Sequence, residues 1–284
     1  MTRPVAVEVS AASVAAAAVV CVTNPMEVVK TRLQLLGEGG RASEAPKNPF
    51  ATLWSIGRRE GVRGVQAGLV SGIAYQVVMN GTRLGAYEAC KKTLPEVMGE
   101  ARSVVAGAAT GIAGAFLASP FFQVKVQLQS RKVPDLATGF KEILRVEGVS
   151  GLFRGANAAM LRVAAGSAAQ LSSYDFFKAR LGCLIDDGPK LHFAASLATS
   201  MVVVGVMQPF DVVSTRLYNS RAYRGILDCA TTAIRTEGIR GLYKGSLAHY
   251  FRIGPHTILI FVAWEQCRLF ADRVITYYGE SRPP

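Results

Sequence analysis

Residues 119–129 read SPFFQVKVQLQ. Similar stretches stand earlier and later in the chain, TNPMEVVKTRLQ at 23–34 and QPFDVVSTRLY at 208–218. Two positions, two and five residues after the proline, differ between the copies. They are occupied by Glu27 and Lys30, by Phe122 and Lys125, and by Asp211 and Ser214. An acid is therefore missing from one copy and a base from another.

The repeat extends well beyond these stretches. The prolines at 25, 120 and 209 are 95 and 89 residues apart, and Glu-Gly pairs begin at 60, 147 and 237. The phrases VRGVQAG, VSGLFRG and IRGLYKG follow those pairs, and YEACK, YDFFK and WEQCR come near the end of each unit. The pattern predicts a single domain of three homologous repeats, over residues 1–98, 99–188 and 189–284.

The composition is that of a membrane protein. Of the 284 residues, 50% are hydrophobic and 28 are glycine, and the mean hydropathy is positive. The net charge of +12 fits nucleic acid, anionic lipid or an anionic substrate. We expect no nucleic-acid partner, because neither a helix-turn-helix pattern nor a basic strand with interleaved aromatic residues is present. The five cysteines are scattered without a CxxC pair, which favours small apolar residues in a reducing compartment.

An apolar run precedes each of the three prolines. The first run, taken alone, resembles a secretory signal, but its recurrence inside the chain favours a structural helix. Each repeat holds two apolar spans, and about twenty residues at 1.5 Å each cross a hydrocarbon core of about 30 Å. The expected fold is an all-α integral membrane protein. It has six transmembrane helices in a threefold pseudo-symmetric bundle, three short amphipathic helices on one face, and both termini on the other.

The charges after the prolines can pair in two ways. Pairing within each helix, between residues three apart, leaves Lys125 and Asp211 alone near the membrane, where lone charges are costly. If proline kinks bring the three helix ends into a ring, each acid can reach the base of the next repeat. The pairs are then Glu27–Lys125 and Asp211–Lys30, and no charge is left alone. The opposite direction leaves Glu27 and Lys30 unpaired, so charge counting selects the first direction for this proline ring.

The remaining position of the proline ring joins Phe122 to Ser214, and no charge is left there. Nine residues after each proline stand Gln34, Gln129 and Tyr218. A glutamine amide could brace an ion pair, and glutamine is absent only where the base is absent. We therefore interpret the two substitutions as one coordinated change.

A second set of charges, the outer ring, lies toward the opposite ends of the even-numbered spans. Its predicted pairs are Glu88–Lys178, Asp175–Arg268 and Glu265–Lys91. Two rings at opposite ends of one bundle are typical of two gates that are not closed at the same time.

Taken together, these motifs resemble those of the mitochondrial carrier family, and the resemblance covers essentially the whole chain. It implies the mitochondrial inner membrane, both termini in the intermembrane space, a matrix gate at the proline ring and a cytoplasmic gate at the outer ring. Within the family the resemblance is strongest to the oxaloacetate carriers of fungi and their animal relatives. Stretches that carry it include YQVVMNGTRLGAYE (75–88) and YFRIGPHTILIF (250–261).

Each even-numbered span carries one arginine, at 83, 162 or 252. Arg162 and Arg252 lie at mid-span, which makes a functional role the first hypothesis. For Arg83, nearer the outer ring, snorkelling to the interface is a strong alternative. The family's substrate contact positions correspond in this chain to Tyr75 with Gln76, Arg162 with Val163, and Arg252.

Two guanidiniums facing one cavity suit a small anion with two negative groups, because Arg binds carboxylates with two hydrogen bonds. Oxaloacetate or a related keto- or dicarboxylate fits, and sulfate fits equally. His256, one turn from Arg252, either carries a proton with the substrate or is a neutral, hydrogen-bonded helix residue. His192 and His249 are expected near the membrane interfaces and receive no role.

Three classes of function were weighed. An enzyme would need a nucleophile–base pair, a metal cluster or a cofactor loop, and no such motif is present. We therefore predict a transporter working by alternating access, with no cofactor and no metal. Another small anion, or an adaptor that does not transport, is the alternative. Exchange and proton-coupled import both remain open. Expected partners are the anion and inner-membrane lipid, with cardiolipin at the matrix helices as a candidate, and the protein is expected to be a monomer.

Overall fold

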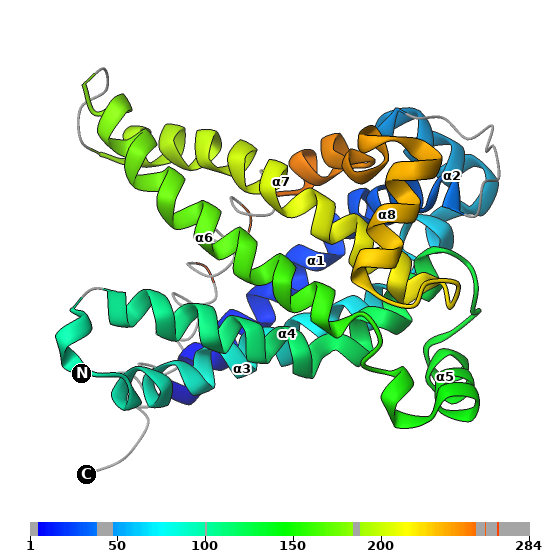
Figure 1. Ribbon diagram of the computed structural model, residues 1–284, viewed down its shortest axis with the longest axis horizontal. Helices are drawn as coiled ribbons and strands as arrows, with labels where there is room; N and C mark the ends of the chain where they lie inside the picture. Colours follow the sequence, from blue (N-terminus) through cyan, green and yellow to red (C-terminus); the bar gives the residue numbers. More distant parts are fainter. Residues whose placement is uncertain are drawn as a thin grey trace, which may run out of the picture.

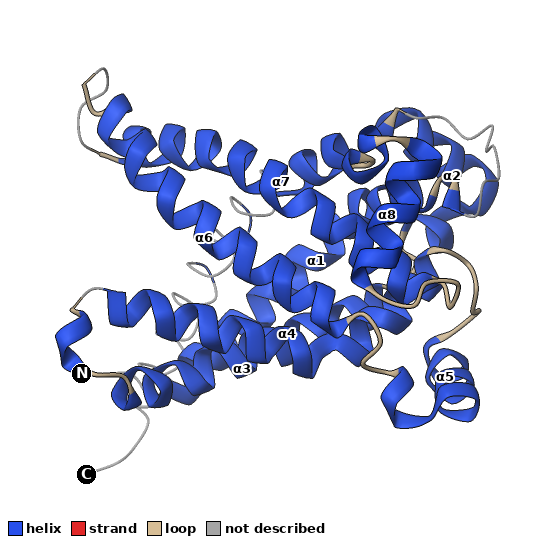
Figure 2. Ribbon diagram, viewed as in Figure 1, coloured by secondary structure: helices blue, strands red, loops and turns tan. Residues whose placement is uncertain are grey.

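A computed structural model describes residues 5–38, 48–99, 101–183 and 188–253, together with residues 259 and 266. Over this part of the chain the secondary structure is helical and no strand is present (Figure 2). Long helices carry the three prolines: α1 (Val5–Leu35), α4 (Ala101–Gln129) and α7 (Pro189–Asn219). Two more long helices are α3 (Leu69–Thr93) and α6 (Ala156–Leu181). The short helices are α2 (Pro49–Val65), α5 (Leu136–Gly151) and α8 (Ile226–Glu237), with 3₁₀ turns η2 (Glu96–Met98) and η3 (Ile239–Tyr243).

The order long, short, long repeats along the chain, as the sequence predicts. It is complete in the first two repeats, and the third continues through α8 into a helical stretch at 246–253. By length and apolar character alone, two described helices could cross a membrane, over residues 102–129 and 191–219. The arrangement of six spans therefore stays a prediction, and most of the expected sixth span lies outside the described residues.

The three proline-containing helices meet at one end of the molecule. In Figure 1, α6 with α7 and α3 with α4 form two pairs that diverge toward one side. They converge toward the side where α2, α5 and α8 lie, which we call the short-helix end. There α1 contacts both α4 and α7, and α4 contacts α7. Val28, Val29 and Leu33 of α1, buried with Ile56 and Ala248, form a hydrophobic cluster at this end.

Side-chain caps and glycines set the ends of the short helices. Asn48 and Asp135 cap α2 and α5, each accepting a hydrogen bond from a backbone N–H of the first turn. The glycine of each Glu-Gly pair, at 61, 148 and 238, has a positive φ between 63° and 71°. Residues with a Cβ avoid this conformation. The repeated Glu-Gly pair thus breaks each short helix immediately after its glutamate.

Those glutamates bind cations at the short-helix end. Glu60 accepts two hydrogen bonds from Arg32 at 2.6 and 2.7 Å, and Arg131 of the second repeat lies 2.8 Å from it. The other two glutamates also have two cationic partners each, Arg154 and Arg221 for Glu147, and Arg216 and Lys244 for Glu237. We call these ion pairs the glutamate collar. Because Arg131 and Arg221 come from the following repeat, the collar joins neighbouring repeats.

The collar should make stability depend on pH. The hydrogen bonds from Arg32 hold the pKa of Glu60 below its usual value of 4.5. A carboxyl whose pKa is lower in the folded state stabilises the protein above its unfolded-state pKa and loses that contribution as the pH falls. Glu60→Gln should therefore lower the melting temperature at pH 7 and reduce its further fall on acidification through pH 4.5. Scanning fluorimetry in detergent measures both.

Glu142→Gln, at an exposed position of α5, is the matched control and should leave the pH profile as in the wild type. Equal profiles for Glu60→Gln and wild type would contradict the stabilising role of Glu60.

Candidate functional site

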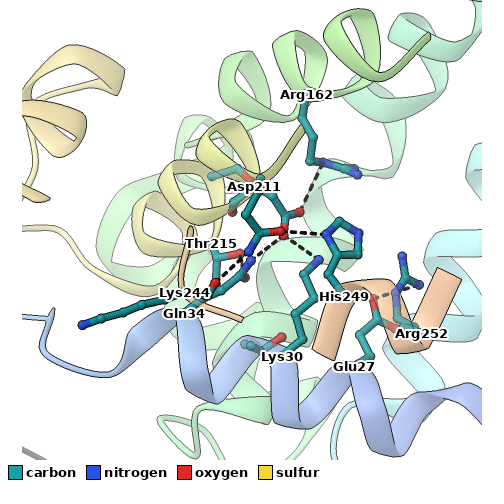
Figure 3. A network of polar contacts seen from close by, with 12 residues as sticks. Glu27, Lys30, Gln34, Arg162, Asp211, Thr215, Lys244, His249 and Arg252 are labelled. Carbon is teal, nitrogen blue, oxygen red and sulfur yellow. Dashed lines mark hydrogen bonds and ion pairs between the residues drawn. The ribbon is translucent and has the colours of Figure 1, made fainter. Parts of the chain in front are cut away.

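The proline ring closes in the direction that charge counting predicts. Lys125 Nζ of α4 lies 2.6 Å from Glu27 Oε2 of α1. Lys30 Nζ of α1 lies 2.5 Å from Asp211 Oδ2 of α7, and Figure 3 shows this second pair. Both pairs connect different repeats. The predicted pairing is therefore confirmed, and the local pairing within each helix is not used.

Three of the four charges of the ring are deeply buried, and the fourth, Glu27, is largely buried, with its side chain 12% exposed. Lys30 is 5% exposed, Lys125 3% and Asp211 0%. Burying an ion pair costs desolvation energy, and removing one partner leaves an uncompensated charge that destabilises by about 3–5 kcal/mol. Each charge in the ring therefore depends on its partner in another helix.

The glutamines that follow the ring differ in their contacts. Gln34 Nε2 donates to Asp211 Oδ2 at 2.6 Å, and its carbonyl accepts from Thr215 at 2.9 Å, so Gln34 braces the Lys30–Asp211 pair as predicted. Gln129 instead accepts a hydrogen bond from Thr31 Oγ1 at 2.6 Å. It ties α4 to α1 beside the ring, through a threonine rather than through the ion pair.

Aromatic side chains fill the place of the missing acid. The ring of Phe122 lies 5.1 Å from that of Tyr75 and 5.2 Å from that of Tyr218, centroid to centroid. Lys125 Nζ is 5.7 Å from the Phe122 centroid, within range of a cation–π contact. Ser214 Oγ donates to the backbone carbonyl of Asp211 in its own helix. A direct meeting of Phe122 with Ser214 stays a prediction.

The two mid-span arginines lie against the ring. Arg162 Nε of α6 is 3.7 Å from Asp211 Oδ1, and its Nη2 donates to the Tyr75 hydroxyl at 3.4 Å. Arg252 Nη1 is 3.7 Å from Glu27 Oε1. In Figure 3 the two arginines approach the ring at different acids, Arg162 beside Asp211 and Arg252 beside Glu27. The structure thus brings together the predicted binding arginines and the predicted gate.

The remaining predicted substrate contacts lie on α3 and α6, except for one in the part of the chain that is not described. Gln76 is half-buried on α3, and Val163 packs near Gly111 of α4. Arg83 is exposed, so its involvement stays a prediction. His256 lies outside the described residues.

The outer ring can be tested at one of its three pairs. Glu88 of α3 and Lys178 of α6 are both described, and they form no ion pair with each other in this part of the structure. Lys91 and Asp175 are described too, but their predicted partners, Glu265 and Arg268, lie outside the described residues. The structure therefore shows the proline ring closed and the one testable outer pair not formed.

Sequence reasoning missed His249 and the polar residue before each of the three prolines, Asn24, Ser119 and Gln208. His249, expected near an interface, is 1% exposed, and its Nδ1 lies 2.8 Å from Oε1 of Gln208. Asn24 donates to the side chain of Gln66, and Ser119 shares a hydrogen bond with the Tyr218 hydroxyl. The feature of the sequence that could have pointed to these contacts is the polar residue before each proline. The position of His249 one turn before Arg252 was a second signal.

A double-mutant cycle tests whether positions 122 and 214 meet. We expect Phe122→Asp with Ser214→Lys to melt higher than the two single changes together predict, because the new charges would neutralise each other. Coupling between residues in contact is about 0.5–3 kcal/mol. Apparent melting temperatures of the four proteins in detergent measure it.

Phe122→Leu is the control, since it removes the contacts with Tyr75 and Tyr218 without adding a charge. Additive shifts of the two single changes would show that the positions do not meet.

Comparison with known proteins identifies the family of the chain. The family model described as "Mitochondrial carrier protein" matches residues 2–98, 99–183 and 187–273. The mitochondrial oxaloacetate transport protein of Saccharomyces cerevisiae is 41% identical over 90% of this chain and 87% of its own length. Mitochondrial citrate transporter E of Aspergillus niger is 42% identical over 93% of both chains. Solute carrier family 25 member 35 of Mus musculus is 39% identical over 90% of this chain and 96% of its own. The chain belongs to the mitochondrial carrier family, whose members are transporters and not enzymes.

Proposed function

We propose that this carrier moves a small dianion across the mitochondrial inner membrane, oxaloacetate or a related keto- or dicarboxylate, with sulfate as a further candidate. One observation carries the proposal. Two largely buried guanidiniums, those of Arg162 and Arg252, with side chains 12% and 20% exposed, lie together against the closed proline ring. Arginine at such a position binds carboxylate or sulfate oxygens with paired hydrogen bonds.

The balance of charge around the ring supports a dianion. Its buried cations outnumber its acids by two, with Lys30, Lys125, Arg162 and Arg252 on one side and Glu27 and Asp211 on the other. A substrate with two negative charges would neutralise this excess. A monoanion would leave one positive charge uncompensated in a poorly solvated site.

The names of the relatives agree with this chemistry. Two of them are called transporters of oxaloacetate and of citrate, both organic acids. The Tyr75 hydroxyl, already within 3.4 Å of Arg162, could donate to a keto oxygen of a bound acid. These features favour a carboxylic acid over sulfate as the principal substrate.

We infer that transport proceeds by alternating access, with the two charged rings as gates. The proline ring is the proposed matrix gate, and Gln34 strengthens one of its two ion pairs. Opening toward the matrix requires both pairs to separate, while the outer ring, as the cytoplasmic gate, forms. As part of the same proposal, the carrier is a monomer with six spans, both termini face the intermembrane space, and cardiolipin binds at the matrix helices.

Uptake by proteoliposomes tests the binding site. Arg162→Ala and Arg252→Ala should each lower the uptake of oxaloacetate, malonate and sulfate by about 10- to 100-fold, because hydrogen bonds to charged groups are worth about 1.5–3 kcal/mol. Wild-type carrier should take up these dianions in preference to ADP. Arg145→Ala, at an exposed position of α5, controls for loss of positive charge and should transport like the wild type.

Wild-type uptake rates in either Arg162→Ala or Arg252→Ala would rule out a site built on the two arginines. Preferred uptake of ADP would rule out the substrate class.

A further inference from the structure

Each acid of the proline ring uses its two oxygens differently. Asp211 gives Oδ2 to Lys30 at 2.5 Å and to the amide of Gln34 at 2.6 Å, while its Oδ1 faces Arg162 at 3.7 Å. Glu27 likewise gives Oε2 to Lys125 at 2.6 Å and turns Oε1 toward Arg252 at 3.7 Å. Each acid therefore has one close cationic partner in the ring and one more distant cationic partner in the proposed binding site.

The loose contacts leave hydrogen bonds unmade. At 3.7 Å an N–H and a carboxylate oxygen attract each other but do not form a hydrogen bond. Nε of Arg162, Nε of Arg252 and Oδ1 of Asp211 are all buried without a hydrogen-bond partner in the described structure. Buried groups of this kind normally find partners. Two donors and one acceptor beside the ring are therefore available to complete their hydrogen bonds with a ligand.

We propose that Asp211 and Glu27 stand in for the two anionic groups of the substrate while the site is empty. Each holds one arginine loosely, and the substrate takes both arginines over with shorter, directed hydrogen bonds. This inference rests on the proposed function and goes beyond it, because it makes the acids of the matrix gate competitors of the substrate.

Competition has a consequence for gating. When the substrate takes Arg162 and Arg252, each ring acid loses one of its two cationic neighbours and gains a negative group beside it. The closed ring is then less stable with substrate bound than without it. A ligand shifts a conformational equilibrium only through such differential interaction. The shared arginines therefore provide a direct link between occupancy of the site and opening of the matrix gate.

A purely structural role for the loose contacts makes the opposite prediction. If the arginines only reinforce the ring, removing a ring acid weakens the ring and disorders the arginine that binds substrate. Substrate affinity then falls or stays unchanged. If the acid competes with the substrate, the ring is weaker but substrate binds more tightly.

The test removes one ion pair of the ring at a time. Asp211→Asn alone would leave Lys30 buried without a counter-charge, so the variant is Lys30→Gln with Asp211→Asn. The second is Lys125→Gln with Glu27→Gln. Both remove a neutral pair, so the net charge at the site is unchanged and tighter binding cannot be attributed to net charge. The chain already lacks such a pair at positions 122 and 214, which supports folding of these variants.

Malonate is the probe, titrated against thermal stability in detergent. Both double variants should melt lower than the wild type without malonate and bind malonate more tightly by roughly three- to tenfold, as expected for release from one ion-pair contact. Glu60→Gln is the matched control. It removes a carboxylate that pairs with Arg32 and Arg131 in the collar, so it should melt lower with unchanged malonate affinity.

Each result of the malonate titration either supports or overturns the proposed competition. Unchanged or weaker malonate binding by both double variants overturns the competition, although wild-type binding would still support the proposed function. Tighter binding by Glu60→Gln as well would also overturn it, because general loosening would then explain the effect. If wild-type carrier binds neither malonate nor oxaloacetate nor sulfate, the proposed function fails, and the inference fails with it.

Discussion

Lys30, Lys125 and Asp211 are almost excluded from solvent, and each is neutralised by a side chain from another repeat. A buried charge that loses its partner is strongly destabilising, so these contacts hold α1 against both α4 and α7. If positions 122 and 214 face each other as predicted, the same physical constraint explains why an acid and a base are absent together there. Losing only one of them would have left a buried charge without a partner. Aromatic packing of Phe122 replaces the lost attraction.

The surrounding structure keeps this closed arrangement in register. At the short-helix end, the collar glutamates each bind two cations, and Arg131 and Arg221 cross to the preceding repeat. Glycines with positive φ follow those glutamates, where they kink α2 and α5 and end α8. The ring and the collar form two layers of charge at the same end of the bundle. Most bases of the collar are more exposed than those of the ring, as the 58% exposure of the Arg131 side chain illustrates, but Arg216 is as deeply buried as the ring lysines.

The proline ring lies next to the predicted binding residues. Arg162 and Arg252 approach the ring acids without hydrogen-bonding them, and Tyr75 and Phe122 line the same place. In the proposed mechanism, a dianion site that shares its acids with the matrix gate responds to its occupant through electrostatics alone. No separate relay between a distant site and the gate is needed, because the distances involved are those of direct contact.

The sequence by itself determined the three repeats, the direction of the proline ring, and the two arginines of the proposed site. The repeats are visible as recurring motifs, and the ring direction follows because only one direction leaves no charge without a partner. The two arginines stand out because they are charges at mid-span. Only the tertiary structure decided that Arg162 and Arg252 touch the ring acids, that Gln129 bonds Thr31, and that His249 is buried beside Gln208. These contacts depend on how far apart and at what angle helices of different repeats pack. Side-chain spacing along one helix carries no record of that geometry.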